Sequence, residues 1–318
     1  MATIAARDFL TANTGSSRAV IVALLIASIA GSSGCAAAGA IASAPPPGVV
    51  ESLEQLPDDS RARDVPIMIY APSTGDRPFP VILFSHGLGS SRQGYAYLGW
   101  EWASRGYVSI HVQHVGSDSE LLRTKGLWAI YRAPFNGQEY EDRPLDISFV
   151  IDTMERRAAS AKAGSLWARL DLSRIGVGGH SYGAHTALTL VGMLVNFPHY
   201  HGRSFRDARV KAALILSPPA MAWSPTTKEF APIHSPTMHM SGSRDTSQLW
   251  HITLSHRRRA FDCIRGAPRY FLNIDDATHP TFADHETMRV AKKNGRLDRT
   301  DPPWMRVRTA EEQRQIAL

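Results

Sequence analysis

The sequence predicts an α/β fold, in which a mostly parallel central sheet is covered by helices on both faces. From about residue 65 onward, short apolar runs of strand length alternate with longer stretches of helical periodicity. This alternation is typical of parallel sheets, whose strands are joined by crossover helices. The composition agrees, because 43% hydrophobic and 20% charged residues suit a packed core and argue against extensive disorder.

The expected strands and helices follow one another along the chain. Phe79–Ser85 is the clearest strand, because it is a continuous apolar run flanked by proline and glycine, as a strand buried on both faces should be. Leu145–Ala158 is the clearest helix, because its apolar side chains recur on one helical face. The other strands are expected at Val65–Tyr70, Tyr107–Val112, Arg174–Gly178, Lys211–Ser217, Pro236–Gly242 and Arg269–Ile274. The other helices are expected at Ser91–Arg105 and Tyr182–Leu194.

Two segments, 115–144 and 195–209, show neither pattern and are expected to be irregular. The first is rich in glycine and aromatic residues, and the second is similar. Long excursions above a sheet often form lids or pocket walls. Ordinary surface loops are the alternative, and both interpretations stay open.

The N-terminus has the pattern of an export signal. Arg7 and Arg18 precede an uncharged apolar run at 19–30, and small residues follow at 31–40. The run is too short to span a membrane comfortably. We therefore expect a signal peptide or lipoprotein signal over 1–38, and an exported protein that is periplasmic, secreted or lipid-anchored to a bacterial membrane.

Two ways of processing this signal fit the sequence. Ala36–Ala38 offers a site for ordinary signal peptidase. Ser32–Cys35 instead resembles the lipobox of bacterial lipoproteins, in which the cysteine becomes lipidated. An uncleaved anchor is the remaining alternative. After the signal we expect a linker over 39–60, which contains a proline-rich stretch, and one folded domain over 61–318.

Charge and cysteine usage exclude several classes of function. Lys plus Arg is 35 and Asp plus Glu is 29, which gives a net charge of +6 that is spread along the chain. The one tight basic cluster, Arg257–Arg259, is expected to be a solvated helix face, so no nucleic-acid partner is expected. Cys35 and Cys263 cannot build a disulfide framework, and we expect Cys263 to be a small buried apolar residue. Neither zinc-type spacing nor a phosphate-binding loop occurs, so no metal or cofactor is expected.

The strongest functional signal is the pentapeptide GHSYG at Gly179–Gly183. It follows an expected strand and precedes an expected helix, which is the context that a G-x-S-x-G nucleophile elbow requires. The flanking glycines remove side chains that would clash in the tight turn, so that the hydroxyl of Ser181 is exposed at the start of the helix. The alternative is a glycine-rich turn with an idle serine.

A serine hydroxyl needs a base to become a nucleophile, and the base needs an acid to orient it. On a sheet of this kind the three residues follow in the order serine, acid, histidine. Asp245 follows the strand expected at Pro236–Gly242, and His279 follows the strand expected at Arg269–Ile274. Because the carboxyl ends of parallel strands meet at one edge of the sheet, we expect both side chains to reach Ser181.

Other residues compete for these two roles. Asp275 and Asp276 lie on the same loop as His279 and are alternatives to Asp245 as the acid. His180, inside the elbow, should turn away from a substrate. His185, about a helical turn after Ser181, should pack inside the fold. The histidines weighed against His279 are His180, His185, His251, His256 and His285.

An oxyanion hole is expected beside Ser181. One donor should be the backbone N–H of Tyr182, which directly follows the nucleophile. The second should come from an early strand-to-helix loop, and Ser85–Gly89, SHGLG, directly follows an expected strand. Its glycines would let the backbone approach the site, so we expect the second donor to be the N–H of Leu88. The alternative is that this loop is only a tight turn.

These segments resemble the α/β-hydrolase superfamily, and within it bacterial esterases related to platelet-activating-factor acetylhydrolase, often labelled predicted dienelactone hydrolases. The resemblance spans about residues 60–285 and is carried by FSHGLGSS, RPLDISFVID, GVGGHSYGAHTALTL, MSGSRDTS and DDATHPTF. It implies an α/β-hydrolase fold and ester hydrolysis by a Ser–Asp–His triad without a cofactor. True dienelactone hydrolases have a cysteine where this chain has Ser181. Family members usually end in a long helix, whereas Thr309–Leu318 is short, so we expect a truncated C-terminal helix.

The sequence thus predicts a serine hydrolase that acts on small-molecule or lipid esters. Ser181 would be the nucleophile, His279 the base and Asp245 the orienting acid. A lipidated Cys35 would attach the protein to a membrane. The alternatives are an exported serine peptidase or amidase on the same fold, and a non-catalytic binding module on a hydrolase scaffold.

Overall fold

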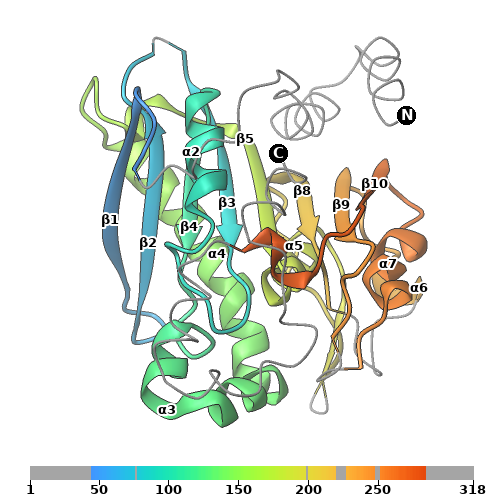
Figure 1. Ribbon diagram of the computed structural model, residues 1–318. Helices are drawn as coiled ribbons and strands as arrows, with labels where there is room; N and C mark the ends of the chain where they lie inside the picture. Colours follow the sequence, from blue (N-terminus) through green and yellow to red (C-terminus); the bar gives the residue numbers. More distant parts are fainter. Residues whose placement is uncertain (1–43, 76, 198–199, 220–226, 248–250, 284–318) are drawn as a thin grey trace, which may run out of the picture.

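A sheet of eight strands forms the centre of the molecule, in the order β1-β2-β4-β3-β5-β8-β9-β10 (Figure 1). β1 and β2 are antiparallel to their neighbours and the other strands of this sheet run parallel, which confirms the predicted mostly parallel sheet. The strands are β1 Val49–Asp58, β2 Arg63–Pro72, β3 Phe79–Ser85, β4 Val108–Val112, β5 Leu170–His180, β6 Val195–Phe197, β7 Tyr200–Arg203, β8 Val210–Leu216, β9 Thr237–Gly242 and β10 Arg269–Ile274. This computed structural model describes residues 44–75, 77–197, 200–219, 227–247 and 251–283.

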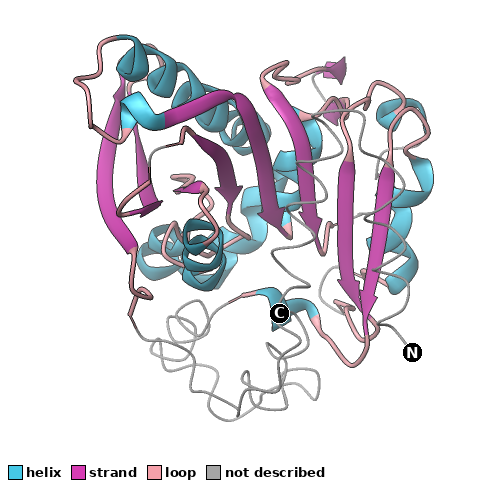
Figure 2. Cartoon of the chain, turned by 90° about the horizontal axis from the view of Figure 1, so that it is seen from above, coloured by secondary structure: helices cyan, strands magenta, loops and turns pink. Residues whose placement is uncertain are grey.

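Helices cover both faces of the sheet, as Figure 2 shows. α2 packs on one face, and α4 and α5 pack on the other. Within the described ranges, no helix combines the length and the apolar character that a membrane span needs. The helices are α2 Ala96–Ser104, α3 Ser119–Arg132, η1 Ala133–Phe135, α4 Gly137–Ala159, η2 Trp167–Arg169, α5 Tyr182–Leu190, α6 Thr227–Phe230, α7 Leu254–Cys263 and η3 His279–Phe282, where η marks a 3₁₀ helix.

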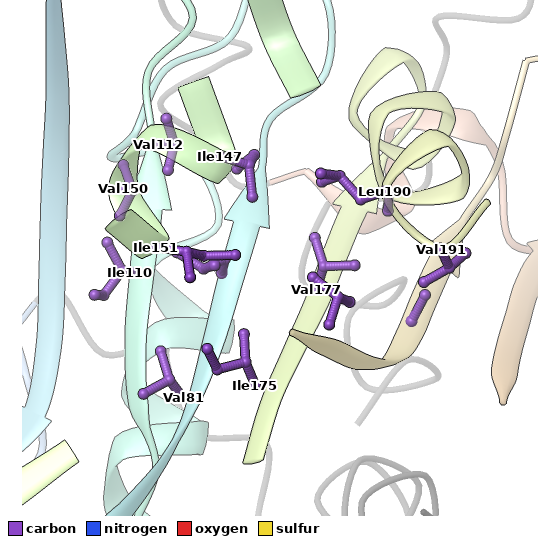
Figure 3. Close-up of a cluster of buried hydrophobic side chains, with 14 of the residues drawn as sticks. Val81, Ile110, Val112, Ile147, Val150, Ile151, Ile175, Val177, Leu190 and Val191 are labelled. Atoms are coloured by element: carbon purple, nitrogen blue, oxygen red, sulfur yellow. The ribbon is translucent and has the colours of Figure 1, made fainter. Parts of the chain in front are cut away.

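Two hydrophobic clusters fix the helices on the sheet. Successive side chains of a strand point to opposite faces, so a strand buried on both faces contributes to both clusters. In β3, Val81 and Leu83 belong to the cluster that includes α4 and α5, whereas Ile82 and Phe84 belong to the cluster that includes α2. Figure 3 shows the first cluster, in which Ile151 of α4 packs beside the strands. This packing holds the carboxyl ends of the strands in a fixed arrangement.

The predicted linker over 39–60 is wrong for Val49–Asp58, which forms β1. This strand pairs with β2 along its whole length. Most of its side chains are exposed or half-buried, and only a few, such as Leu56, are buried. An edge strand is held mainly by its backbone hydrogen bonds and by one face, so β1 lacks the apolar run that marks the central strands.

The prediction that 115–144 is irregular is also wrong, because α3 and the start of α4 occupy most of it. Gly126 interrupts α3 with a φ of 75°, and this break explains why the segment lacks helical periodicity. Pro144 lies inside α4 and removes one backbone donor there. The predicted helix at Leu145–Ala158 is therefore only the later part of a helix that begins at Gly137.

The remaining differences concern shorter stretches. The segment 195–209 contains a small hairpin, β6–β7. The helix expected at Ser91–Arg105 begins only at Ala96, and the one expected to reach residue 194 ends at Leu190. The predicted export signal with Cys35 and the short C-terminal stretch Thr309–Leu318 lie outside the described residues.

Candidate active site

The GHSYG segment forms the tight turn between β5 and α5. Ser181 has a φ of 54° and a ψ of −118°, a backbone conformation that is strained for a residue with a side chain. A Cβ on Gly179 would lie 2.1 Å from the Gly183 carbonyl oxygen, and a Cβ on Gly183 would lie 1.8 Å from the Ser85 carbonyl oxygen. Both glycines are therefore required by backbone contacts, as the pentapeptide predicts.

We expect Gly183→Ala to destabilise the protein by about 3 kcal/mol, because the added methyl group meets the backbone of β3 and overpacking of this kind strains a core. Chemical denaturation would measure the free energy of unfolding. Gly202→Ala is the matched control, because its Cβ would point into open space. Its φ of 69° makes the alanine cost about 1 kcal/mol. Equal losses of stability in the two variants would contradict this account of the elbow.

The structure brings the three predicted triad residues together. The Oγ of Ser181 lies 2.9 Å from the Nε2 of His279, and the Nδ1 of His279 lies 3.1 Å from an Oδ1 of Asp245. Asp245 follows β9 and His279 follows β10, and these loops are tightly packed: a Cβ on Gly242 would lie 2.0 Å from the Ala277 carbonyl oxygen. The hydroxyl, imidazole and carboxylate thus form a continuous chain of hydrogen bonds.

Ser217, which sequence reasoning missed, lies beside this chain at the end of β8. Its hydroxyl donates to the Oδ2 of Asp245 and also lies 2.6 Å from the Nδ1 of His279. Its φ of 50° places it in the left-handed region. The only sequence signal for Ser217 was its position at the carboxyl end of β8, which lies between β5 and β9 in the sheet. The spacing of the motif alone does not indicate its role.

The sequence-based prediction for Arg257 was wrong. The basic cluster was predicted to be a solvated helix face, but the Arg257 side chain is only 1% exposed, whereas that of its neighbour Arg258 is 51% exposed. The Nε of Arg257 lies 3.0 Å from the Oδ1 of Asp245. The prediction failed because one side of a short, strongly charged helix packs against a buried carboxylate, which no periodicity reveals.

The surroundings of Asp245 keep its carboxylate ionised. Burial alone would raise the pKa of Asp245. The Arg257 charge and the hydrogen bonds to His279 and Ser217 outweigh burial and hold this pKa well below its usual range. Ser241 also donates to the Oδ2, at 2.9 Å. The site therefore presents a permanent negative charge to the imidazole.

His279 is held as a neutral base. Burial lowers the pKa of His279, and the nearby charge of Arg257 lowers it further. The carboxylate of Asp245 opposes both effects, but the net pKa remains below the ordinary value. An imidazole with a lowered pKa is unprotonated at neutral pH, which is the form that accepts a proton from a serine.

The rival acids point elsewhere. The Oδ1 of Asp275 accepts a hydrogen bond from the Ser243 hydroxyl at 3.0 Å, and Asp276 lies 4.0 Å from Arg244 at the surface. The carboxylate that faces His279 is that of Asp245.

Three of the rival histidines have structural partners. The Nδ1 of His180 lies 2.7 Å from the Tyr95 hydroxyl, beneath the elbow. His185 packs edge-on against Tyr140, as expected for a residue inside the fold. The side chain of His256 contacts Thr253 at the start of α7. His251 is exposed, and His285 lies outside the described residues.

The expected oxyanion loop lies against the elbow. A Cβ on Gly87 would lie 3.5 Å from the Cβ of Ser181. The N–H of Gly87 donates to the Tyr95 hydroxyl, and that of Gly89 donates to the Ser117 carbonyl oxygen. Within the described part of the chain, the N–H of Leu88 has no acceptor. The loop thus offers one uncommitted backbone donor next to the nucleophile.

Arg143 of α4 braces both sides of this region. Its guanidinium is buried and donates to the His86 carbonyl oxygen and to the hydroxyls of Ser117 and Thr186. It also lies over the Tyr182 ring, 4.5 Å from the ring centroid. One side chain therefore links the SHGLG loop to the first turns of α5. The local sequence gave no sign of this role, because the contacts come from distant segments.

A second Ser–His–Asp arrangement begins at Ser85, the first residue of the SHGLG loop. The Oγ of Ser85 lies 2.9 Å from the Nε2 of His114, whose Nδ1 lies 2.9 Å from the Oδ2 of Asp146. All three residues are fully buried. Burial keeps the pKa of His114 well below its usual value. Because no substrate can reach this hydroxyl, the arrangement supports the loop and contrasts with the partly exposed His279.

Potential metal ligands and the cysteines do not form a further site in the described part of the chain. No group of three or more His, Cys, Asp or Glu side chains there is arranged to hold a metal ion. Cys263 is half-buried at the end of α7 and packs against the main core. Lipidation of Cys35 stays a prediction.

Comparisons with known proteins agree with this architecture. The family described as platelet-activating factor acetylhydrolase, isoform II, matches residues 64–121. No curated protein matches the sequence. A ferulic acid esterase from Streptomyces cinnamoneus matches in structure with a TM-score of 0.55 and 20% identity, over 76% of this chain and 78% of that one. A protein described as a dienelactone hydrolase, from Klebsiella pneumoniae subsp. pneumoniae, matches with a TM-score of 0.53 and 13% identity, over 77% of this chain and 96% of that one.

The structural matches extend over most of the chain, whereas the family match covers β2 to the start of α3 and includes the SHGLG loop. The mostly parallel sheet, the elbow between β5 and α5, and the loops after β9 and β10 occur here in the arrangement that the sequence predicted. The protein therefore has the α/β-hydrolase fold, and its residues 64–121 match the platelet-activating factor acetylhydrolase isoform II family.

Proposed function

We propose that the protein is a serine hydrolase that cleaves carboxylic esters through an acyl-enzyme intermediate. The observation that carries this proposal is the hydrogen-bonded chain from Ser181 through His279 to Asp245, which ends at a hydroxyl on a strained turn. A strained, glycine-flanked turn is kept in a fold where function requires it. The matches to esterases and hydrolases support the same class of reaction.

In the first half of the reaction, the Oγ of Ser181 attacks the carbonyl carbon of the ester. His279 accepts the hydroxyl proton at Nε2, and the charged imidazolium is stabilised by Asp245 at Nδ1. The carbonyl oxygen becomes an oxyanion, which accepts hydrogen bonds from the N–H groups of Leu88 and Tyr182. The tetrahedral intermediate then collapses, and His279 returns the proton to the departing alcohol.

In the second half, a water molecule hydrolyses the acyl-enzyme. His279 takes a proton from the water, and the resulting hydroxide attacks the acyl carbon. The same two N–H groups stabilise the second oxyanion. Collapse releases the carboxylic acid and returns the proton to Ser181. Every proton moves through one imidazole, so the mechanism needs no further titratable group.

The side chains beside the oxyanion loop favour an ester with an apolar part. Tyr140, Tyr182 and Val195 form a small hydrophobic cluster, against which Leu88 and Phe197 pack in half-buried positions. Half-buried aromatic and aliphatic groups next to a reactive hydroxyl suit an apolar acyl or alcohol group. We infer a small-molecule or lipid ester as the substrate.

A panel of substrates tests this function. We expect hydrolysis of short-chain p-nitrophenyl esters, little or no hydrolysis of peptide p-nitroanilides, and covalent labelling by a fluorophosphonate at Ser181, located by mass spectrometry. Faster cleavage of the anilides would identify a peptidase or amidase instead. A protein that neither hydrolyses the esters nor reacts with the fluorophosphonate would be a binding module on a hydrolase scaffold.

A further inference from the structure

Arg257 is a buried cation that the mechanism above does not use. It lies on α7, which packs beside β9 and β10 (Figure 1). Its Nη1 donates to the carbonyl oxygens of Ser217 and Pro218, at 3.0 and 3.1 Å. Its Nε faces the Oδ1 of Asp245. Burying a charged side chain so completely is costly unless it is paired, so its contacts within the site need an explanation.

The decisive feature is that a single oxygen of the Asp245 carboxylate contacts both the Arg257 guanidinium and the His279 imidazole. The Oδ1 of Asp245 lies 3.0 Å from the Nε of Arg257 and 3.1 Å from the Nδ1 of His279. A permanent positive charge at the same carboxylate oxygen offsets part of the negative field of Asp245 at the imidazole. The imidazolium form of His279 is then less stabilised than it would be beside an unpaired carboxylate.

Among the residues that the structure describes, no further charged group changes the electrostatic balance at the imidazole. His180 stacks near His279, with ring centroids 4.6 Å apart, but burial keeps the pKa of His180 well below its usual value, so its ring is neutral. Ser217 contributes a hydroxyl that carries no charge. Asp275 and Asp276, on the loop before His279, are directed toward Ser243 and Arg244. Within the described part of the chain, the charges that face the imidazole are thus those of Asp245 and Arg257.

We propose that Arg257 is a positioning residue which, through Asp245, keeps His279 in its neutral, proton-accepting form at mildly acidic pH. This proposal rests on the proposed function, because it assigns a role within the same site. The guanidinium also fixes the left-handed turn at Ser217 through that residue's carbonyl oxygen. The cost is a weaker stabilisation of the imidazolium during catalysis. The gain is activity that persists at lower pH.

The experiment compares acidic limbs of pH profiles. Arg257→Gln and Arg257→Met remove the charge, Arg257→Lys retains it, and Arg258→Gln removes an equal charge from the exposed side of the same helix. The readouts are the second-order rate of fluorophosphonate labelling and kcat/KM for a short-chain p-nitrophenyl ester, each from pH 4.5 to 8.

In the wild type, activity should fall as the pH drops through an apparent pKa below the ordinary histidine value, because His279 must be unprotonated. In Arg257→Gln and Arg257→Met this limb should move up by about 0.5–1 pH unit, because the opposing cation is gone. On the acidic side of both limbs this shift lowers the rate about three- to tenfold. The limb of Arg257→Lys and that of Arg258→Gln should stay at the wild-type position.

Each outcome separates this proposal from the proposed function. If the wild type is neither labelled nor active, the proposed function fails. If the wild type shows the limb and the neutral Arg257 variants share it unshifted, the function stands and the role of Arg257 is rejected. If neither neutral variant unfolds cooperatively like the wild type, Arg257 is a folding determinant and the proposal is again rejected.

Discussion

Ser181→Ala is expected to lower kcat/KM for ester hydrolysis by about 10⁵- to 10⁶-fold, because the variant has no group that can form the acyl-enzyme. Alanine keeps the Cβ and the strained backbone of the elbow, so the fold should survive and the melting temperature should change little. The residual rate would come from the oxyanion donors and from substrate binding. Steady-state assays with p-nitrophenyl esters would measure the loss, and fluorophosphonate labelling should disappear completely.

Ser104→Ala is the matched control for this substitution. Ser104 is an exposed serine at the end of α2, and its hydroxyl donates only to a carbonyl oxygen of its own helix. Its activity and labelling should equal those of the wild type. Wild-type turnover by Ser181→Ala would remove the nucleophile from the proposed mechanism.

Asp245→Asn is expected to lower kcat by about 10⁴-fold, because an amide favours the wrong tautomer of the base. The carboxylate of Asp245 accepts a hydrogen bond from the N–H at Nδ1 of His279. It thereby favours the tautomer in which Nε2 is free to accept the proton of Ser181. An asparagine amide that donates to Nδ1 would instead place the proton on Nε2. The measurement is kcat at a pH well above the acidic limb.

The same substitution should destabilise the fold, because it leaves the buried charge of Arg257 without a counter-ion. Removing one partner of a buried ion pair costs about 3–5 kcal/mol. Both side chains are almost completely buried here, so solvent offers little compensation. Chemical denaturation would detect this loss separately from the loss of kcat, and the double variant Asp245→Asn with Arg257→Met should recover part of the stability.

Asp275→Asn is the control that separates the two candidate acids. Asp275 is exposed and bonds only with its own loop and with Ser243. Its substitution should leave kcat within about twofold and the stability within about 0.5 kcal/mol of the wild type. If kcat fell with Asp275→Asn and not with Asp245→Asn, the acid would have been assigned to the wrong residue.

The central strands could be predicted accurately because their signal is local. Phe79–Ser85, for example, has the same bounds in sequence and structure. A buried strand needs apolar side chains on both faces, and this requirement is written into consecutive residues. Edge and interrupted elements carry weaker signals. Val49–Asp58 is exposed on both faces over much of its length, and α3 is broken at Gly126, so neither shows a clear period.

The difference between the site residues that could be predicted and those that could not has the same origin, namely whether their signal is local. The elbow around Ser181 is a local device of strand, turn and helix, so its residues are recognisable in the sequence. Asp245 and His279 could be predicted from the sequence because a parallel sheet brings the carboxyl ends of its strands together. Arg257 carries no such mark, since whether an arginine on a short helix faces solvent or a carboxylate depends on how that helix packs.

The amino-acid sequence by itself determined the α/β sheet, the strained serine turn and the order of the three triad residues, because each follows from local pattern and strand polarity. Tertiary packing alone decided which charges are buried: it placed Arg257 and Ser217 around Asp245, and it placed Arg143 between the SHGLG loop and α5. Burial and charge pairing arise between segments far apart in the chain, and they are properties of the packed molecule rather than of any one segment.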